Sequence, residues 1–232
     1  MTDFHSHILP GIDDGASDVS ESLKMLAMMQ EQGVRRVVAT PHFYANHDHP
    51  QRFLERRQAA ENALRKALPN KKPPQIYVGA EVRYFDGMSD CGLLEKLTIG
   101  QSKYLLVEMP NSVWSERHFR ELLGIYQKTG ITPVIAHMDR YISPFQTHGI
   151  PDALVQLPVL VQVNATFFTS FATRRMALRL LRNDQIHLIG SDCHNLTDRK
   201  PNLSEATQII QKKLGDDALK RIARYEKTVL GF

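Results

Sequence analysis

Short apolar runs rich in β-branched residues recur along the chain and alternate with segments of helical periodicity. Each run has the length of one buried strand, and the N-terminal Asp3-Phe4 is a candidate for one more. Strands that alternate with helices form parallel sheets covered by helices, and about seven such units favour closure into a barrel. We therefore predict an α/β fold, a distorted (β/α)7 TIM-like barrel, with further strands at 37–39, 76–78, 105–107, 133–135, 159–161 and 187–189.

The first helical segment has clear start and stop signals. Ser17 or Asp18 can cap it, Glu21 stands where a capping box needs an acid, and Gly33 can end it. No linker or low-complexity tract interrupts the 232 residues, so we predict one domain over 1–232. Further helices, the last of them broken at Gly215, are predicted at 51–68, 88–97, 115–129, 171–183 and 202–230.

Histidines and acidic residues stand just after six of the seven predicted strands. The carboxyl ends of parallel strands meet at one rim of a βα barrel, which is where active sites form. A single histidine in such a place is mostly structural, but the repetition favours a shared site. We expect one metal centre built from His5, His7, Asp14, His42, Glu81, Glu108, His137, Asp192 and His194.

The mixture of side chains indicates which metals could bind. His5 and His7 point to the same side of an extended chain because strand side chains alternate. Imidazoles and carboxylates without thiolates suit Mn²⁺, Fe²⁺ or Zn²⁺ better than Ca²⁺. Nine candidate ligands exceed the needs of one ion, so we expect two or three clustered ions with a carboxylate between neighbours.

Composition and charge indicate the compartment and the partners that we expect for the protein. Two cysteines, Cys91 and Cys193, are too few for a disulfide framework and favour a reducing compartment. The apolar stretches fall short of the roughly 18 residues that a membrane span needs, so we expect a cytoplasmic protein that is not membrane-embedded. The basic residues between 52 and 72 are interpreted as a solvated helix face, with an anionic partner as the alternative; we expect no nucleic-acid partner.

The candidate ligands sit in recognisable strings. The most specific is His-Ile-Leu-Pro-Gly-Ile-Asp-Asp-Gly at 7–15, followed by Ala-Thr-Pro-His at 39–42, Gly-Ala-Glu-Val at 79–82, Ala-His at 136–137 and Ser-Asp-Cys-His at 191–194. In this order they resemble the polymerase and histidinol phosphatase (PHP) superfamily over nearly the whole chain. Within it, the chain is most similar to the manganese-dependent protein-tyrosine phosphatases of bacterial capsule and exopolysaccharide operons.

The resemblance implies a PHP-type barrel that holds three ions, with Mn²⁺ as the expected metal. It also implies that Arg140 and Arg199 contact the phosphate and act in catalysis together with Asp14. By resemblance, the ligands would divide into His5, His7, Glu81 and Asp192; Glu81, Glu108 and His137; and Asp14, His42 and His194.

The implied reaction is hydrolysis of phosphotyrosine, with the C-terminal tail of a bacterial tyrosine kinase that controls polysaccharide synthesis as the protein substrate. A hydroxide bridging two metals is the expected nucleophile. Tyr44, Tyr84 and Phe85 follow ligand-bearing strings and could form an aromatic lip, with ordinary packing as the alternative. Two departures from the family pattern, Met138-Asp139 and Cys193, bear on substrate fit rather than on the ligands.

Other functions fit parts of the same pattern. A different PHP phosphomonoesterase, such as a histidinol-phosphate phosphatase, or an exonuclease-like site would use the same ligands. Cys193 and Arg199 match the C-x5-R spacing of cysteine-dependent phosphatases, a match we interpret as accidental because His194 and Asp192 belong to the metal set. A regulatory module that only binds phosphotyrosine is the remaining alternative.

Structural roles are predicted for several polar residues outside the ligand set. Asn164 is predicted to order the pocket by hydrogen bonding, and residues 46–49 to form a mobile loop. His118, His148 and His187 are interpreted as structural or exposed.

Overall fold

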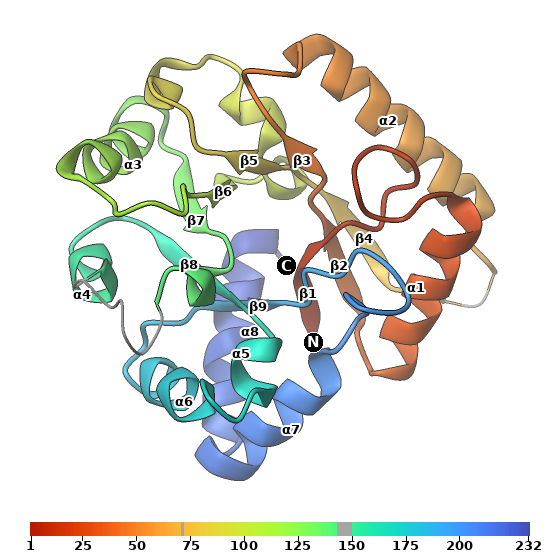
Figure 1. The fold of residues 1–232 in the computed structure, drawn as a ribbon. Helices are drawn as coiled ribbons and strands as arrows, with labels where there is room; N and C mark the ends of the chain where they lie inside the picture. The colour runs from red at the N-terminus through yellow and green to blue at the C-terminus, as the bar shows by residue number, and fades with distance from the viewer. Residues whose placement is uncertain (71, 143–149) are drawn as a thin grey trace.

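The computed structural model describes residues 1–70, 72–142 and 150–232. Helices surround a ring of strands (Figure 1). The strands are β1 (Thr2–Ser6), β2 (Arg36–Ala39), β3 (His42–Phe43), β4 (Gln75–Val78), β5 (Glu81–Arg83), β6 (Tyr104–Glu108), β7 (Thr132–Ile135), β8 (Leu160–Asn164) and β9 (Leu188–Gly190). The helices are α1 (Val19–Glu31), α2 (Pro50–Ala67), α3 (Glu116–Thr129), α4 (Ile150–Val155), α5 (Thr166–Thr169), α6 (Arg174–Arg182), α7 (Leu203–Leu214) and α8 (Asp216–Leu230).

Every strand pair is parallel, in the orders β1-β2-β4 and β3-β5-β6-β7-β8-β9. β3 and β5 continue the lines of β2 and β4 after two-residue interruptions, so the two sheets form one curled surface. The ring closes where the chain after β9 meets β1: the Asp192 amide donates to the His5 carbonyl at 2.8 Å, and the His7 amide to the Cys193 carbonyl at 2.9 Å. The predicted (β/α)7 TIM-like barrel is confirmed.

The helix ends follow the local sequence signals. The Asp18 carboxylate accepts from the Glu21 amide at 2.9 Å, and Glu21 in turn accepts from Ser17, so both predicted caps take part at the start of α1. Gly33 has a φ of 79°, in the left-handed region that glycine adopts most easily. The predicted break at Gly215 separates α7 from α8.

The predicted helix at 88–97 is wrong. This segment forms two 3₁₀ turns, η1 (Met88–Asp90) and η2 (Leu94–Leu97), with Gly92 between them. Ser89 and Asp90 bond to side chains of α3, including a 2.7 Å contact between Lys128 and Asp90, and these tertiary bonds compete with a continuous helix. The turns η3 (Ile99–Gln101) and η4 (Met138–Arg140) and the short helices α4 and α5 were not foreseen.

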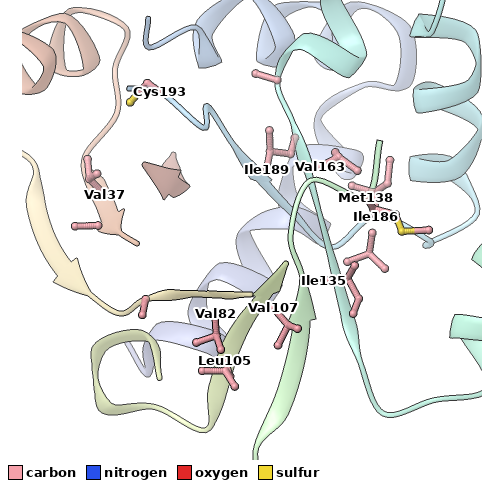
Figure 2. Close-up of a cluster of buried hydrophobic side chains, with 14 of the residues drawn as sticks. Val37, Val82, Leu105, Val107, Ile135, Met138, Val163, Ile186, Ile189 and Cys193 are labelled. Carbon is pink, nitrogen blue, oxygen red and sulfur yellow. The ribbon is translucent and has the colours of Figure 1, made fainter. Parts of the chain in front are cut away.

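Alternation along the strands sorts the apolar residues into two layers. The larger cluster packs between sheet and helices, and Figure 2 shows Val37, Val107 and Ile135 among its members. A smaller cluster takes the alternate positions inside the barrel and includes Leu106, with Val229 of α8 packed against it. The inward positions beyond this apolar layer are therefore the places where the strands carry polar side chains into the ring.

Across the described residues, no helix is both long and apolar enough to cross a lipid bilayer. α2, with 18 residues, carries the five arginines and lysines between 52 and 66 of the basic cluster predicted as a solvated face. That prediction is only partly right: Arg57 is largely enclosed and donates to the carbonyls of Gly79 and Lys96, both at 2.8 Å, so it ties the helix to the barrel.

Candidate metal centre

All nine predicted ligands come together at the carboxyl ends of the strands. His5 lies in β1, His42 begins β3, Glu81 begins β5 and Glu108 ends β6. The others lie in the segments that follow strands: His7 and Asp14 after β1, His137 after β7, and Asp192 and His194 after β9. Contacts within the site join all nine residues. We continue to predict that these residues bind metal.

The deepest group contains His5, His7, Glu81 and Asp192, which are nearly or fully buried. The Nε2 atoms of His5 and His7 are 3.1 Å apart, and Glu81 Oε2 lies 3.1 Å from the first and 3.4 Å from the second. Asp192 Oδ1 lies 3.5 Å and 3.6 Å from the same two nitrogens. Both carboxylates therefore approach the same pair of imidazole nitrogens.

Glu81 also connects this group with a second one. Its other oxygen, Oε1, lies 2.8 Å from His137 Nε2, and Glu108 Oε1 lies 3.8 Å from the same nitrogen. His42 Nδ1 lies 3.0 Å from Glu81 Oε2. A carboxylate placed between two sets of donors has the position of a bridging ligand.

A third group faces solvent. Asp14 Oδ1 lies 3.4 Å from His42 Nε2 and 3.4 Å from His194 Nε2. The Asp14 side chain is 63% exposed, whereas His194 is buried. This side of the centre is therefore open to a substrate.

The residues present fit divalent cations. Hydrogen bonds occupy the Nδ1 atoms of two histidines: His5 contacts Gln162 Oε1 at 3.2 Å and His7 contacts Asp13 Oδ2 at 2.7 Å, which leaves both Nε2 atoms for another partner. Within the described part of the chain, Glu81 Oε2, Glu108 Oε2 and His194 Nε2 are buried without a hydrogen-bond partner. Buried polar atoms normally have partners, and a cation would supply them here.

The electrostatics of the deepest group lead to the same conclusion. Burial opposes protonation of the His5 and His7 rings, but the carboxylates of Glu81, Asp192 and Asp13 outweigh it and raise the pKa of both histidines. Burial likewise opposes ionisation of Glu81, yet His5 and His137 hold its pKa well below the usual range. The site thus attracts positive charge, and a divalent ion can take the place of the protons.

Backbone constraints hold this arrangement. His137 and Asp192 have φ values of 32° and 54°, a strained region for residues other than glycine that is concentrated at functional sites. Gly190 lets β9 approach β1, because a Cβ at this position would lie 2.5 Å from the Cβ of His5. Gly15 likewise allows a close approach to His7, because a Cβ at Gly15 would lie 2.4 Å from the Cβ of His7.

Two residues that orient ligands were not predicted. Asp13 bonds His7 and accepts from the His42 amide at 3.0 Å; burial works against ionisation, but these bonds lower its pKa to about 2. Gln162 contacts His5 and accepts from the His137 amide at 2.7 Å. Asp13 could have been found from its place beside Asp14, whereas nothing in the sequence around Gln162 indicates its partners.

Arg140 and Arg199 flank Asp192 from both sides. Arg140 contacts Asp192 Oδ2, and Arg199 contacts Oδ1 at 2.8 Å and lies 4.0 Å from Asp14 Oδ2. Both side chains are 39% exposed, so their guanidinium groups can also meet a ligand that enters from solvent. The predicted role of Asn164 in ordering the pocket is confirmed, because its amide donates to Asp192 Oδ2 at 3.0 Å.

The predicted aromatic lip is only partly assembled. The Tyr44 ring stacks on the His42 ring at 5.3 Å, so Tyr44 borders the centre. Tyr84 instead packs against His118 and bonds Asp86, and Phe85 is partly buried against the core. Tyr84 and Phe85 thus have the packing role named as the alternative.

His118 and His187 have structural partners, as predicted. His118 completes the capping box of α3 with Ser115, and His187 Nδ1 accepts from the Val161 amide at 2.9 Å. His148 lies outside the described residues. Residues 46–49 enter a turn in which the His47 amide donates to the Tyr44 carbonyl at 3.0 Å.

Cys193 does not have the environment of a nucleophile. Its side chain is fully buried, and burial raises the pKa of the thiol well above the usual range. A reactive cysteine needs a lowered pKa and access to substrate. The C-x5-R match is therefore accidental, as predicted.

Gly190→Ala should weaken metal binding, because the new Cβ must displace His5 from the deepest group. Overpacking of this kind costs about 1–3 kcal/mol of stability. We expect less bound metal per chain by elemental analysis and a lower Tm. Gly92→Ala is the matched control, since no atom within 4 Å would meet its Cβ; equal metal content in the two variants would contradict the close approach.

Asp13→Asn should lower the affinity for metal about 10- to 100-fold, the usual effect of removing the carboxylate that orients a ligating histidine. The measurement is a competition titration against a metal-binding dye. Asp86→Asn, which alters an exposed carboxylate paired with Arg117, should leave the affinity unchanged. An unchanged affinity in Asp13→Asn would show that His7 is positioned by other means.

Comparison with known proteins agrees with this geometry. Residues 1–230 match the family model "Capsular polysaccharide synthesis, CpsB/CapC". The chain is 32% identical to the tyrosine-protein phosphatase CpsB of Streptococcus pneumoniae (96% of this chain, 94% of that protein) and 29% identical to the tyrosine-protein phosphatase YwqE of Bacillus subtilis (94% and 86%).

Solved structures extend the likeness to the fold. A crystal structure from work on YwqE and CpsB, described there as unique metal-dependent tyrosine phosphatases, matches with a TM-score of 0.83 at 27% identity, covering 100% of this chain and 94% of that one. An organophosphorus hydrolase variant shares the fold alone, with a TM-score of 0.53 at 12% identity, covering 98% and 92%. The chain belongs to the CpsB/CapC family of capsular polysaccharide synthesis.

Proposed function

We propose that this chain, a metal-dependent tyrosine-protein phosphatase of capsular polysaccharide synthesis, hydrolyses phosphotyrosine at the centre formed by its nine histidines and acids. The observation that carries the proposal is the buried contact of two carboxylates with two imidazoles: Glu81 Oε2 and Asp192 Oδ1 each lie within 3.6 Å of both His5 Nε2 and His7 Nε2. Residues 1–232 form one phosphatase domain in this proposal.

The grouping of donors supports a division of the ligands among three ions. The donor atoms that lie within 4.8 Å of one another come from His5, His7 and Glu81; from His42, Glu81 and Glu108; and from His7, Asp14, His42 and His194. We assign His5, His7, Glu81 and Asp192 to the first ion, Glu81, Glu108 and His137 to the second, and Asp14, His42 and His194 to the third. When bound, divalent ions supply an activated water and draw charge from the phosphoryl oxygens. Imidazole and carboxylate ligands suit Mn²⁺, which we propose as the metal, ahead of Fe²⁺ and Zn²⁺.

The residues of the chain itself then bind and orient the phosphate. Arg140 and Arg199 compensate Asp192 in this structure, and a cation at Asp192 would release their donors to the phosphoryl oxygens, where negative charge collects. Asp14, on the open side, would act through the ion that it shares with His42 and His194. A tyrosyl leaving group, with a pKa near 10, needs little help from a general acid.

The proposed substrate is a phosphotyrosine protein, namely the C-terminal tail of a bacterial tyrosine kinase that controls polysaccharide synthesis, met in the cytoplasm. The exposed Asp14 face supports this, because a phosphotyrosine on a flexible tail can reach the open side of the centre without any opening of the barrel. Nucleic acid has no part in the proposal.

Chelation should abolish hydrolysis of a phosphotyrosine peptide, and Mn²⁺ should restore it, since every assigned ligand acts through the metal. Release of phosphate after EDTA treatment and metal add-back is the measurement. Cys193→Ser should retain near-normal turnover because its thiol is buried and protonated. Activity that survives chelation, or a preference for small alkyl phosphates such as histidinol phosphate over the peptide, would count against the proposal.

A further inference from the structure

A hollow of about 420 Å³ lies beside the metal centre and is lined by Tyr44, Asn46, His47 and Arg83. Tyr44 joins the two places, because its ring stacks on the ring of His42 at 5.3 Å. Arg83 lies on β5, two residues beyond Glu81, and its guanidinium lies over the Tyr44 ring, 5.9 Å from the centroid. A peptide bound at the centre would therefore pass this hollow.

All four lining side chains can donate hydrogen bonds, and none of the described residues that line the hollow is a carboxylate. A guanidinium, a phenol, an amide and an imidazole together favour an anionic ligand.

The charge of Arg83 is poorly compensated. Within the described residues the carboxylate that approaches it is Glu108, at 3.8 Å, and Glu108 is itself directed towards His137 in the metal centre. Other arginines of the same rim have closer partners: Arg56 lies 2.7 Å from Asp48, and Arg117 lies 3.1 Å from Asp86. The Arg83 side chain is 50% exposed, so a ligand can reach it.

We propose that this hollow is a substrate subsite that binds an anionic group one or two residues from the phosphotyrosine. The shared chemistry is a carboxylate of a flanking Asp or Glu, or the phosphate of a second phosphotyrosine. The inference rests on the proposed function, and it adds Arg83 as a residue that determines which phosphotyrosine is preferred.

The test compares kcat/KM for phosphotyrosine peptides that differ only in the flanking residue: glutamate, glutamine, lysine or a second phosphotyrosine. Free phosphotyrosine serves as the substrate without flanks. The wild-type protein, loaded with Mn²⁺, should prefer the glutamate or the doubly phosphorylated peptide over the glutamine peptide by about two- to fivefold, the range of a half-exposed ion pair. Which of the two anions is preferred identifies the source of the charge.

Arg83→Gln should remove this preference through KM and leave turnover of free phosphotyrosine within about twofold. Arg83→Glu should turn the preference towards the lysine peptide, a result that general damage to the site would not produce. Arg117→Gln is the matched control, because it removes an exposed arginine that does not line the hollow, and its preference should equal that of the wild type.

Two results would overturn the subsite. One is equal kcat/KM for all flanking residues in an active wild-type protein; the other is an anion preference that persists in Arg83→Gln. Failure of the proposed function is distinguishable from both, because the wild-type protein would then fail to hydrolyse free phosphotyrosine as well as every peptide.

Discussion

The structure depends on the burial of several carboxylates among imidazoles inside a barrel. Glu81 and Asp192 are almost completely enclosed, and an unpaired buried charge costs far more than a folded domain can offset. In this structure the histidines and Arg140 and Arg199 provide the compensating charge. Divalent cations at the same place would neutralise the carboxylates and also use the lone pairs that the imidazoles direct inward.

Several backbone features of the barrel position the side chains of this centre. The register between β1 and β2 shifts between Asp3 and Ser6, an irregularity at the place where β1 carries His5. Gly190 allows β9 close to His5, and the left-handed conformations of His137 and Asp192 turn both side chains into the site. An apolar layer inside the ring, which includes Leu106, lies two residues below Glu108 and separates the centre from the other end of the barrel.

Much of this could be predicted from the sequence, and the reason is geometric. Parallel strands end on one rim, so residues such as His42 and Glu81, which each come three positions after an apolar run, were expected to meet although 39 positions separate them. Gln162 could not be predicted, because its contacts with His5 and His137 join three strands and leave no local pattern. The predicted helix at 88–97 was wrong because the spacing of apolar residues does not distinguish a helix from 3₁₀ turns that are bonded to α3. The family strings added the division among three ions, which no spacing indicates.

The central claim is that these side chains bind a cluster of cations. Anomalous diffraction at the manganese edge, from crystals grown with Mn²⁺, tests it most directly. We expect separate peaks within coordinating distance of His5 and His7, of Glu108 and His137, and of Asp14 and His194. A map in which Mn²⁺ lies elsewhere on the protein, with these donors bonded only to each other, would contradict the account.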